Sequence, residues 1–161
     1  MASVSIYLNF MGNAEEAFNH YKNVFRSEFS APPLRMKDMP PREGALPLTE
    51  ADKDKVMHVA LPILGGIQIM ATDMLESIGQ KLIEGNNFTI SLNPDTKEEA
   101  DRLYNELSEE GTDGVAPHEE FWGYWVLAKT VLASAGCSIL LSNHSSKNPT
   151  ASSVFFSAYN A

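Results

Sequence analysis

The sequence has a single cysteine, Cys137, among its 161 residues, so no disulfide can form within the chain. Such scarcity is typical of proteins from reducing compartments. No apolar run is long enough to span a bilayer. Residues 1–10 lack the basic and apolar regions of a signal peptide. We therefore expect a cytoplasmic protein that does not bind membranes.

Basic residues are also scarce, because 12 Lys and Arg stand against 21 Asp and Glu and the formal net charge is −9. Nucleic acids and anionic membranes are bound through clustered Lys and Arg, so neither is an expected partner. Apolar residues make up 43% of the chain, and a chain of this size can bury a substantial core. We expect residues 1–161 to form one domain.

The first half of the chain predicts a strand, a helix and three more strands. Residues 4–10 alternate between two faces, which carry Ile6, Leu8 and Phe10, and Tyr7 and Asn9. An apolar stripe of helical spacing follows, and Asn13 with Glu16 predicts a capping box at its start. Three further strands are expected at residues 28–36, 56–63 and 67–71. Residues 37–55 predict a long loop or arm in which LTEADKDK is solvated.

The same order of elements restarts in the second half. Residues 87–93 alternate cleanly, Thr96 with Glu99 predicts a second capping box, and Gly111 ends a second amphipathic helix. Two more strands are expected at residues 115–122 and 124–129. We therefore predict an α+β fold of two βαβββ modules that form a curved mixed sheet with a concave cup. Module 1 covers about residues 1–80 and module 2 about 81–142, and residues 143–161 form an atypical tail.

Four segments resemble a known family: YLNFMGNAEEAFNHYKNVF, MHVALPILGGIQIMATD, NNFTISLNPDTKEEADRLYNELSEEG and FWGYW. They are similar to the PhnB-like branch of the glyoxalase, bleomycin-resistance and dioxygenase superfamily, also called the vicinal oxygen chelate superfamily. This branch is often labelled "3-demethylubiquinone-9 3-methyltransferase-like". The resemblance covers residues 5–129 and implies paired βαβββ units, a pocket in the cup and a homodimer. It does not imply one activity.

Enzymes of this superfamily hold a divalent metal through His, Glu or Gln side chains on cup-facing strands. The fourth expected strand offers Gln68 and, at its end, Asp73. The fifth offers only Asn, Thr and Ser, or apolar side chains, and no Asp or Glu follows Lys129. Neither face of these strands supplies a set of imidazoles and carboxylates that binds a metal tightly. We therefore expect no metal and no other cofactor.

Five residues are candidates for contacting a ligand in the cup: Asn9, His58, Gln68, Glu120 and Trp122. His58 lies between apolar neighbours and is either a pocket-wall histidine or a group that contacts substrate. Glu120 ends a charged turn that is either solvated or faces the cup. The aromatic cluster around Trp122 is either core and dimer contact or pocket lining. No catalytic residue is assigned.

The leading hypothesis is metal-independent binding of a small apolar or aromatic molecule in the cup. One alternative is a metal-dependent lyase, dioxygenase or antibiotic-modifying enzyme, and whether the protein is an enzyme stays open. Another is a structural dimer without a ligand site, whose cup is filled by side chains such as Phe10, Phe88 and Trp122. A homodimer is expected because the proline-rich arm and the aromatic cluster are apolar in places.

The chain changes character after Lys129, since none of the 21 acidic residues follows it and Lys147 is the only charged residue beyond. One back-translation of Lys129–Ile139, read one base out of phase, gives Asp-Arg-Phe-Gly-Ile-Ser-Trp-Met-Phe-Asn. That peptide matches the final-strand pattern of the resembled family. We therefore predict a frameshifted C-terminus, in which GCSILLS (136–142) pairs as a substitute edge strand. A natural but divergent C-terminus is the alternative.

Overall fold

The computed structural model describes residues 4–40, 43–44, 46–83, 88–109, 115–120, 123–128 and 137–143, the last three ranges by their backbone alone. In the first module, the elements are β1 (Ser5–Phe10), α1 (Ala14–Val24), β2 (Leu34–Arg35), β3 (Val56–Pro62) and β4 (Gln68–Asp73). The short helices η1 (Met36–Asp38), η2 (Leu64–Gly66) and η3 (Glu76–Ile78) lie in its connections. The strand order is β1-β4-β3-β2, with β1 parallel to β4 and the other pairs antiparallel.

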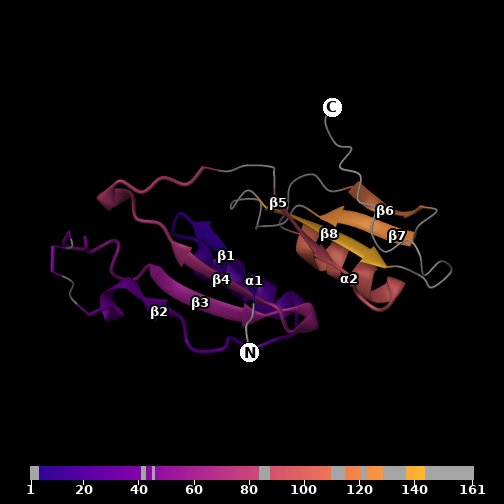
Figure 1. Cartoon of the computed structure of the whole chain (residues 1–161), viewed down its shortest axis with the longest axis horizontal. Helices are drawn as coiled ribbons and strands as arrows, with labels where there is room; N and C mark the ends of the chain where they lie inside the picture. The colour runs from indigo at the N-terminus through magenta and orange to yellow at the C-terminus, as the bar shows by residue number, and fades with distance from the viewer. Residues whose placement is uncertain are drawn as a thin grey trace.

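The second module repeats this topology. Its elements are β5 (Phe88–Leu92), α2 (Lys97–Ser108), β6 (Val115–Glu120), β7 (Gly123–Ala128) and β8 (Cys137–Asn143). The strand order is β5-β8-β7-β6, again with the first strand parallel to the last. Figure 1 shows the two sheets side by side, with α1 in the first module and α2 in the second. The predicted α+β fold of two βαβββ modules is confirmed, and each module has its own four-stranded mixed sheet.

One hydrophobic cluster runs through both modules. Helix α1 buries its apolar stripe, which consists of Ala14, Ala17, Phe18, Tyr21 and Val24. This spacing places one face of the helix against β3 and β4. The cluster continues into the second module through Ile90, Leu92, Leu103 and Leu107. Across the junction, Arg102 Nη1 of α2 donates a 2.9 Å hydrogen bond to the carbonyl of Val24 at the end of α1.

The two helices begin in different ways. Asn13 makes no side-chain capping bond, so the capping box predicted there is wrong. Instead, Asp73 Oδ1 at the end of β4 accepts hydrogen bonds from the amides of Gly12 (2.9 Å) and Ala14 (3.1 Å). Gly12 has a φ of 99°, which favours glycine at the sharp entry into the helix. In α2 the predicted cap forms, because Thr96 Oγ1 accepts from the amide of Glu99 at 3.2 Å.

Asp73 also anchors β3, because its Oδ2 accepts a 2.8 Å hydrogen bond from the amide of Val56. Its side chain is only 3% exposed. A carboxylate placed so deeply needs such donors, since an uncompensated buried charge is strongly destabilising. One side chain therefore holds together the end of β4, the start of β3 and the start of α1.

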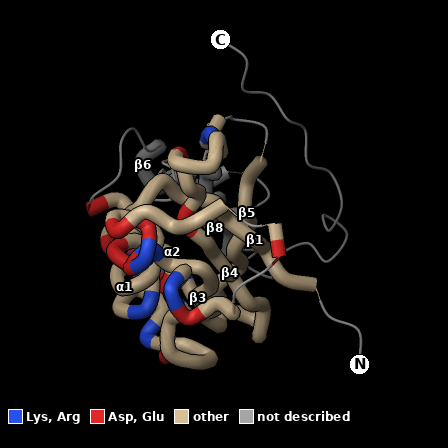
Figure 2. Tube along the Cα trace, turned by 90° about the vertical axis from the view of Figure 1, so that its left-hand side faces the viewer, with Lys and Arg blue, Asp and Glu red and all other residues tan. Residues whose placement is uncertain are grey.

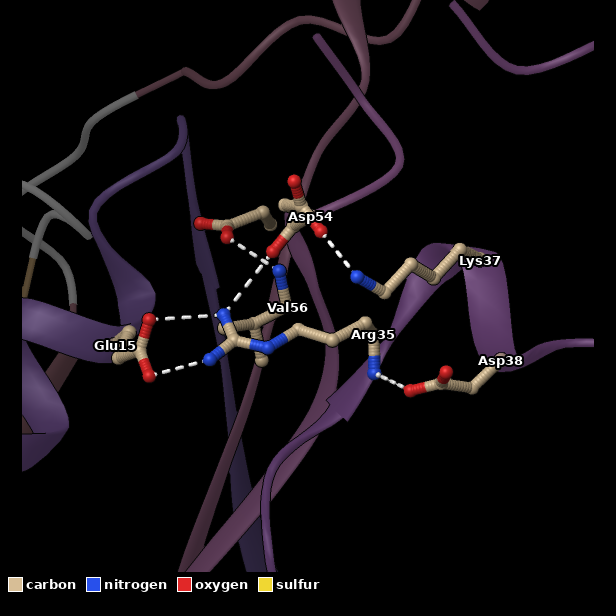
Figure 3. A network of polar contacts seen from close by, with 7 residues as sticks. Glu15, Arg35, Lys37, Asp38, Asp54 and Val56 are labelled. Atoms are coloured by element: carbon tan, nitrogen blue, oxygen red, sulfur yellow. Dashed lines mark hydrogen bonds and ion pairs between the residues drawn. The ribbon is translucent and has the colours of Figure 1, made fainter. Parts of the chain in front are cut away.

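A polar network surrounds Arg35 of β2 (Figure 3). Its guanidinium makes a two-pronged contact with the Glu15 carboxylate, at 2.8 Å and 2.5 Å, and a further 3.0 Å bond to the carbonyl of Asp54. Lys37 pairs with the Asp54 carboxylate at 2.6 Å. The Arg35 hydrogen bond and charge lower the pKa of Glu15. The network fixes β2 and the base of the arm against the first turn of α1.

The arm is less solvated than predicted, because Asp52 within LTEADKDK is 3% exposed. Its carboxylate receives Lys55 at 2.8 Å and the hydroxyls of Ser77 at 2.5 Å and Thr49 at 2.6 Å. These contacts, led by that of Lys55, hold the pKa of Asp52 far below its usual range. The arm is thereby tied to the segment that follows β4.

Two further predictions need correction. The second strand is only two residues long, since Pro32 and Pro33 cannot donate to a ladder. Strand β8 contains most of the predicted GCSILLS segment, but it lies in the middle of its sheet, between β5 and β7, and is not an edge strand. The expected atypical tail from Asn143 onward lies outside the described residues, apart from Asn143 itself. No helix among the described residues is long and apolar enough to cross a membrane.

Candidate functional site

The strand register divides the first sheet into two faces. One face carries Leu8, Phe10, Val59, Leu61, Ile69 and Ala71, all buried in the hydrophobic cluster. On the opposite face, Tyr7, Met70 and Ala60 lie side by side across β1, β4 and β3. Neighbouring rows pair Asn9 with Thr72 and His58 with Leu34. We call this surface the open face, because Tyr7 is 49% and Leu34 38% exposed.

The open face gathers three of the five predicted contact residues. Asn9 and His58 lie in the rows described above, and Gln68 pairs with Ser5 in a third row. Glu120 is the last residue of β6 and pairs with Gly123, and its side chain is not among those described. Trp122 lies outside the described residues.

Tyr7 is the neighbour that the prediction missed. Its hydroxyl lies 3.5 Å from Nδ1 of His58, and the two ring centroids are 6.0 Å apart at 31°. Partial burial raises the pKa of Tyr7, and a hydrogen bond from the Thr72 side chain acts in the opposite direction. The alternation of residues 4–10 placed Tyr7 on the same face as Asn9, and this pattern could have identified Tyr7 as a candidate. The contact with His58, 51 residues away, could not be read from either segment.

The other end of the open face is held by Gln68. Its Nε2 donates a 2.7 Å hydrogen bond to Oγ of Ser30, in the loop before β2. The amide of Ser30 in turn donates to the carbonyl of Ala60 at 3.0 Å. Gln68 is therefore partly committed to fixing this loop beside β3. Of the three gathered residues, Asn9 and His58 have the stronger claim to contact a ligand.

The carboxylate candidate Asp73 does not face this surface. It points into the core side, where three backbone amides occupy it. Among the residues whose side chains are described, no group of three or more His, Cys, Asp or Glu side chains could hold a metal ion. The open face instead offers neutral hydrogen-bonding groups beside apolar ones.

Charge is distributed unevenly around the first module. Figure 2 shows charged residues gathered over the helices and near β3, whereas β1 and β4 are tan along most of their length. In sequence, β1 and β3 contain no Lys, Arg, Asp or Glu, and β4 contains only Asp73. The open face is thus a weakly polar surface bordered by ion pairs.

Solved structures identify this architecture. A protein named PA1353 from Pseudomonas aeruginosa is 28% identical, with a TM-score of 0.72 over 89% of this chain and 98% of that one. A PhnB protein from Bacillus cereus, a putative 3-demethylubiquinone-9 3-methyltransferase by its description, is 19% identical, with a TM-score of 0.66 over 88% and 99%. A glyoxylase/bleomycin resistance protein/dioxygenase domain from Frankia is 10% identical, with a TM-score of 0.60 over 90% and 99%. The chain has the glyoxalase fold.

The predicted resemblance is therefore confirmed at the level of the fold, which the PhnB protein of Bacillus cereus shares. No protein-family model and no curated protein matches the sequence. Within the glyoxalase fold, the first module supplies the described part of the site. Phe10, which a structural dimer would need as a filler of the cup, is instead fully buried in the core.

Proposed function

We propose that this glyoxalase-fold protein binds a small planar molecule on the open face of the first sheet, without a metal ion. The observation that supports this is the arrangement of that face. Tyr7, Met70 and Ala60 form an apolar floor, and Asn9, Thr72 and His58 border it with neutral hydrogen-bonding groups. Binding sites for small molecules have this composition, mostly apolar with a few placed polar groups.

The size of the floor also suits a ring. Neighbouring strands are about 4.8 Å apart, so three strands span about 10 Å. Ala60 contributes only a methyl group at the end of its row, and the Tyr7 and His58 rings lie in contact, with their centroids 6.0 Å apart. A planar ligand can lie on this row and direct one polar substituent toward Asn9 or His58.

We also propose a cytoplasmic homodimer. Ile67 and Phe88, neither of them part of the ligand floor, are 47% and 48% exposed in the single chain. A second copy would remove part of this apolar surface from water. Light scattering at micromolar concentration should give twice the mass of the chain, and a monomer would contradict the proposal.

The binding proposal is tested by screening small aromatic molecules by thermal shift and by equilibrium dialysis. We expect Tyr7→Ala to weaken the best ligand about tenfold or more, since it removes the main aromatic surface of the floor. Ile83→Ala is the matched control, because Ile83 is an apolar residue 89% exposed outside the sheet. Equal loss in both variants, or no ligand at all, would contradict the proposal.

The metal-independent part of the proposal needs its own measurement. Protein purified without chelator should contain no stoichiometric zinc, nickel, manganese or iron, and ligand affinity should be the same before and after dialysis against a chelator. A stoichiometric metal whose removal abolishes binding would favour the metalloenzyme alternative.

A further inference from the structure

The contact between the Tyr7 hydroxyl and the His58 ring is longer than an ordinary hydrogen bond. The 3.5 Å separation of Oη and Nδ1 exceeds the usual hydroxyl hydrogen bond of about 2.8 Å. In ligand-free sites such bonds are often long and tighten when a ligand binds. Because Tyr7 is 49% exposed, its hydroxyl can contact a ligand on the floor and His58 at the same time.

Within the part of the chain whose side chains are described, the surroundings of His58 provide no unpaired fixed charge for an ionic ligand. Leu34 on β2 is its partner, and Thr72 on β4 lies one step past the Val59–Ala71 pair. Among the described side chains, the titratable hydroxyl of Tyr7 contacts it. The cations nearest in sequence and across β2 are already paired with carboxylates: Arg35 with Glu15, Lys37 with Asp54, and Lys55 with Asp52.

We infer that Tyr7 and His58 form a proton-accepting pair that selects a planar ligand with a weakly acidic hydroxyl group, such as a phenol or an enol. This inference rests on the binding function proposed above and specifies its ligand class. A permanently ionised carboxylate or phosphate would find no free cation beside the pair among the described residues, whereas an acidic hydroxyl brings its own proton.

The proton transfer balances without any further reactant. The ligand hydroxyl gives its proton to Oη of Tyr7, and Tyr7 gives its own proton to Nδ1 of His58. One ligand O–H bond breaks, one imidazole N–H bond forms, and Tyr7 ends neutral. The products are a ligand oxyanion that accepts a hydrogen bond from Tyr7 and an imidazolium next to it. Imidazole is suited to this role because it exchanges protons near neutral pH.

The probe for the test is para-nitrophenol, because its anion absorbs visible light and reports its own ionisation. We expect binding to the wild-type protein to lower the apparent pKa of the probe by about one unit, a roughly tenfold gain in anion. His58→Asn keeps a hydrogen-bonding group near the position of Nδ1 but cannot take up a proton, and Tyr7→Phe keeps the ring but breaks the relay. Both variants should lose the gain in anion.

The control ligand is para-nitroanisole, which has the same ring and no acidic proton. Equilibrium dialysis should show that it binds the wild-type protein without any spectral change, and Ile83→Ala, outside the sheet, should keep both this binding and the gain in anion with para-nitrophenol. If para-nitrophenol binds without a gain in anion, or if the gain persists in His58→Asn, the inference is overturned while the binding function stands. The inference is likewise overturned if other aromatic molecules bind and para-nitrophenol does not. If no aromatic molecule binds, the proposed function itself fails.

Discussion

The two modules share one topology but secure their helices by opposite means. Helix α1 is held at its start by partners distant in the sequence, Asp73 and Arg35. Helix α2 begins on a local contact, because Thr96 caps its first turn, and Arg102 pairs with Glu99 and Glu106 on the same helix as well as with the distant carbonyl of Val24. The comparison teaches that identical strand order does not require identical interactions. It also distinguishes contacts that join distant elements of the chain from contacts that lie within one helix.

The largest expected effect comes from removing the distant cap. Asp73→Ala leaves three backbone amides without their acceptor, and each orphaned buried donor costs about 1–3 kcal/mol. We expect a loss of about 3 kcal/mol or more in the free energy of unfolding, measured by urea denaturation. Because such a variant can fail to fold, Asp73→Asn provides a milder second measurement. A loss below that of the local cap would contradict the comparison.

Removing the local cap should have a smaller effect. Thr96→Ala deletes the hydroxyl that accepts from the amide of Glu99, and the loss of an N-cap costs about 1 kcal/mol. The same urea denaturation measures it. Thr96→Ser retains the hydroxyl and should recover most of the stability. If Ser fails to restore what Ala removes, the hydroxyl is not the stabilising group.

Arg35→Met tests the second distant contact through its dependence on pH. The pKa of Glu15 is lowered in the folded protein, so its contribution is present above the unfolded pKa and is lost as the pH falls through the folded pKa. We expect the variant to lose about 0.5 kcal/mol near neutral pH, since the Glu15 side chain is 45% exposed and screened by solvent.

The difference between wild type and Arg35→Met should shrink as the solution is acidified. Lys22→Met is the control, because Lys22 pairs with Glu28 at a more exposed position, where the Glu28 side chain is 81% exposed. A difference that grows in acid would contradict the assigned pairing.

Asn13→Ala should have the smallest effect. Asn13 occupies the N-cap position of α1 but makes no side-chain capping bond, so its removal should change stability by less than about 0.5 kcal/mol. Thermal unfolding of Asn13→Ala and Thr96→Ala, measured under the same conditions, compares the two losses of stability directly. A loss equal to that of Thr96→Ala would show that Asn13 caps the helix in solution.

The second module also carries the prediction of a frameshift after Lys129. The organism's own DNA settles it, because an uninterrupted reading frame through TVLASAGCSILL would refute the frameshift. Strand β8 shows that CSILLSN is compatible with a central strand. That fit follows from its apolar character and does not distinguish a native strand from a substitute.

Local sequence patterns correctly predicted features that depend on near neighbours in the chain, namely the buried face of a strand and one helix cap. Alternation separated Leu8 and Phe10 from Tyr7 and Asn9, and the Thr96–Glu99 spacing identified a true cap. The same reasoning failed at Asn13, because the competing acceptor, Asp73, lies at the end of a strand that pairs with β1 only in the folded chain. Contacts across strands, such as Tyr7 with His58, require the register, which neither segment carries alone.

The central position of β8 was missed for a related reason. An apolar run indicates a strand but does not say how many neighbours it has. The parallel β5–β8 pair is set by the crossover through α2 and the hairpin-like return of β7, which are features of the whole module. The sequence pattern of a single strand was therefore enough to identify candidate residues of the site, but it did not identify the residues that they contact on other strands.

The distance between α1 and its cap has a consequence for synthesis. Asp73 lies 49 residues beyond Val24, the last residue of α1, and ribosomes add about 5–20 residues per second, so the helical segment is synthesised about 2.5–10 s before its cap. During that interval Ala17, Phe18 and Tyr21 have no β3 or β4 to cover them. The early chain therefore presents an uncapped amphipathic helix to chaperones, and amides in truncated chains that stop short of Asp73 should exchange freely with solvent.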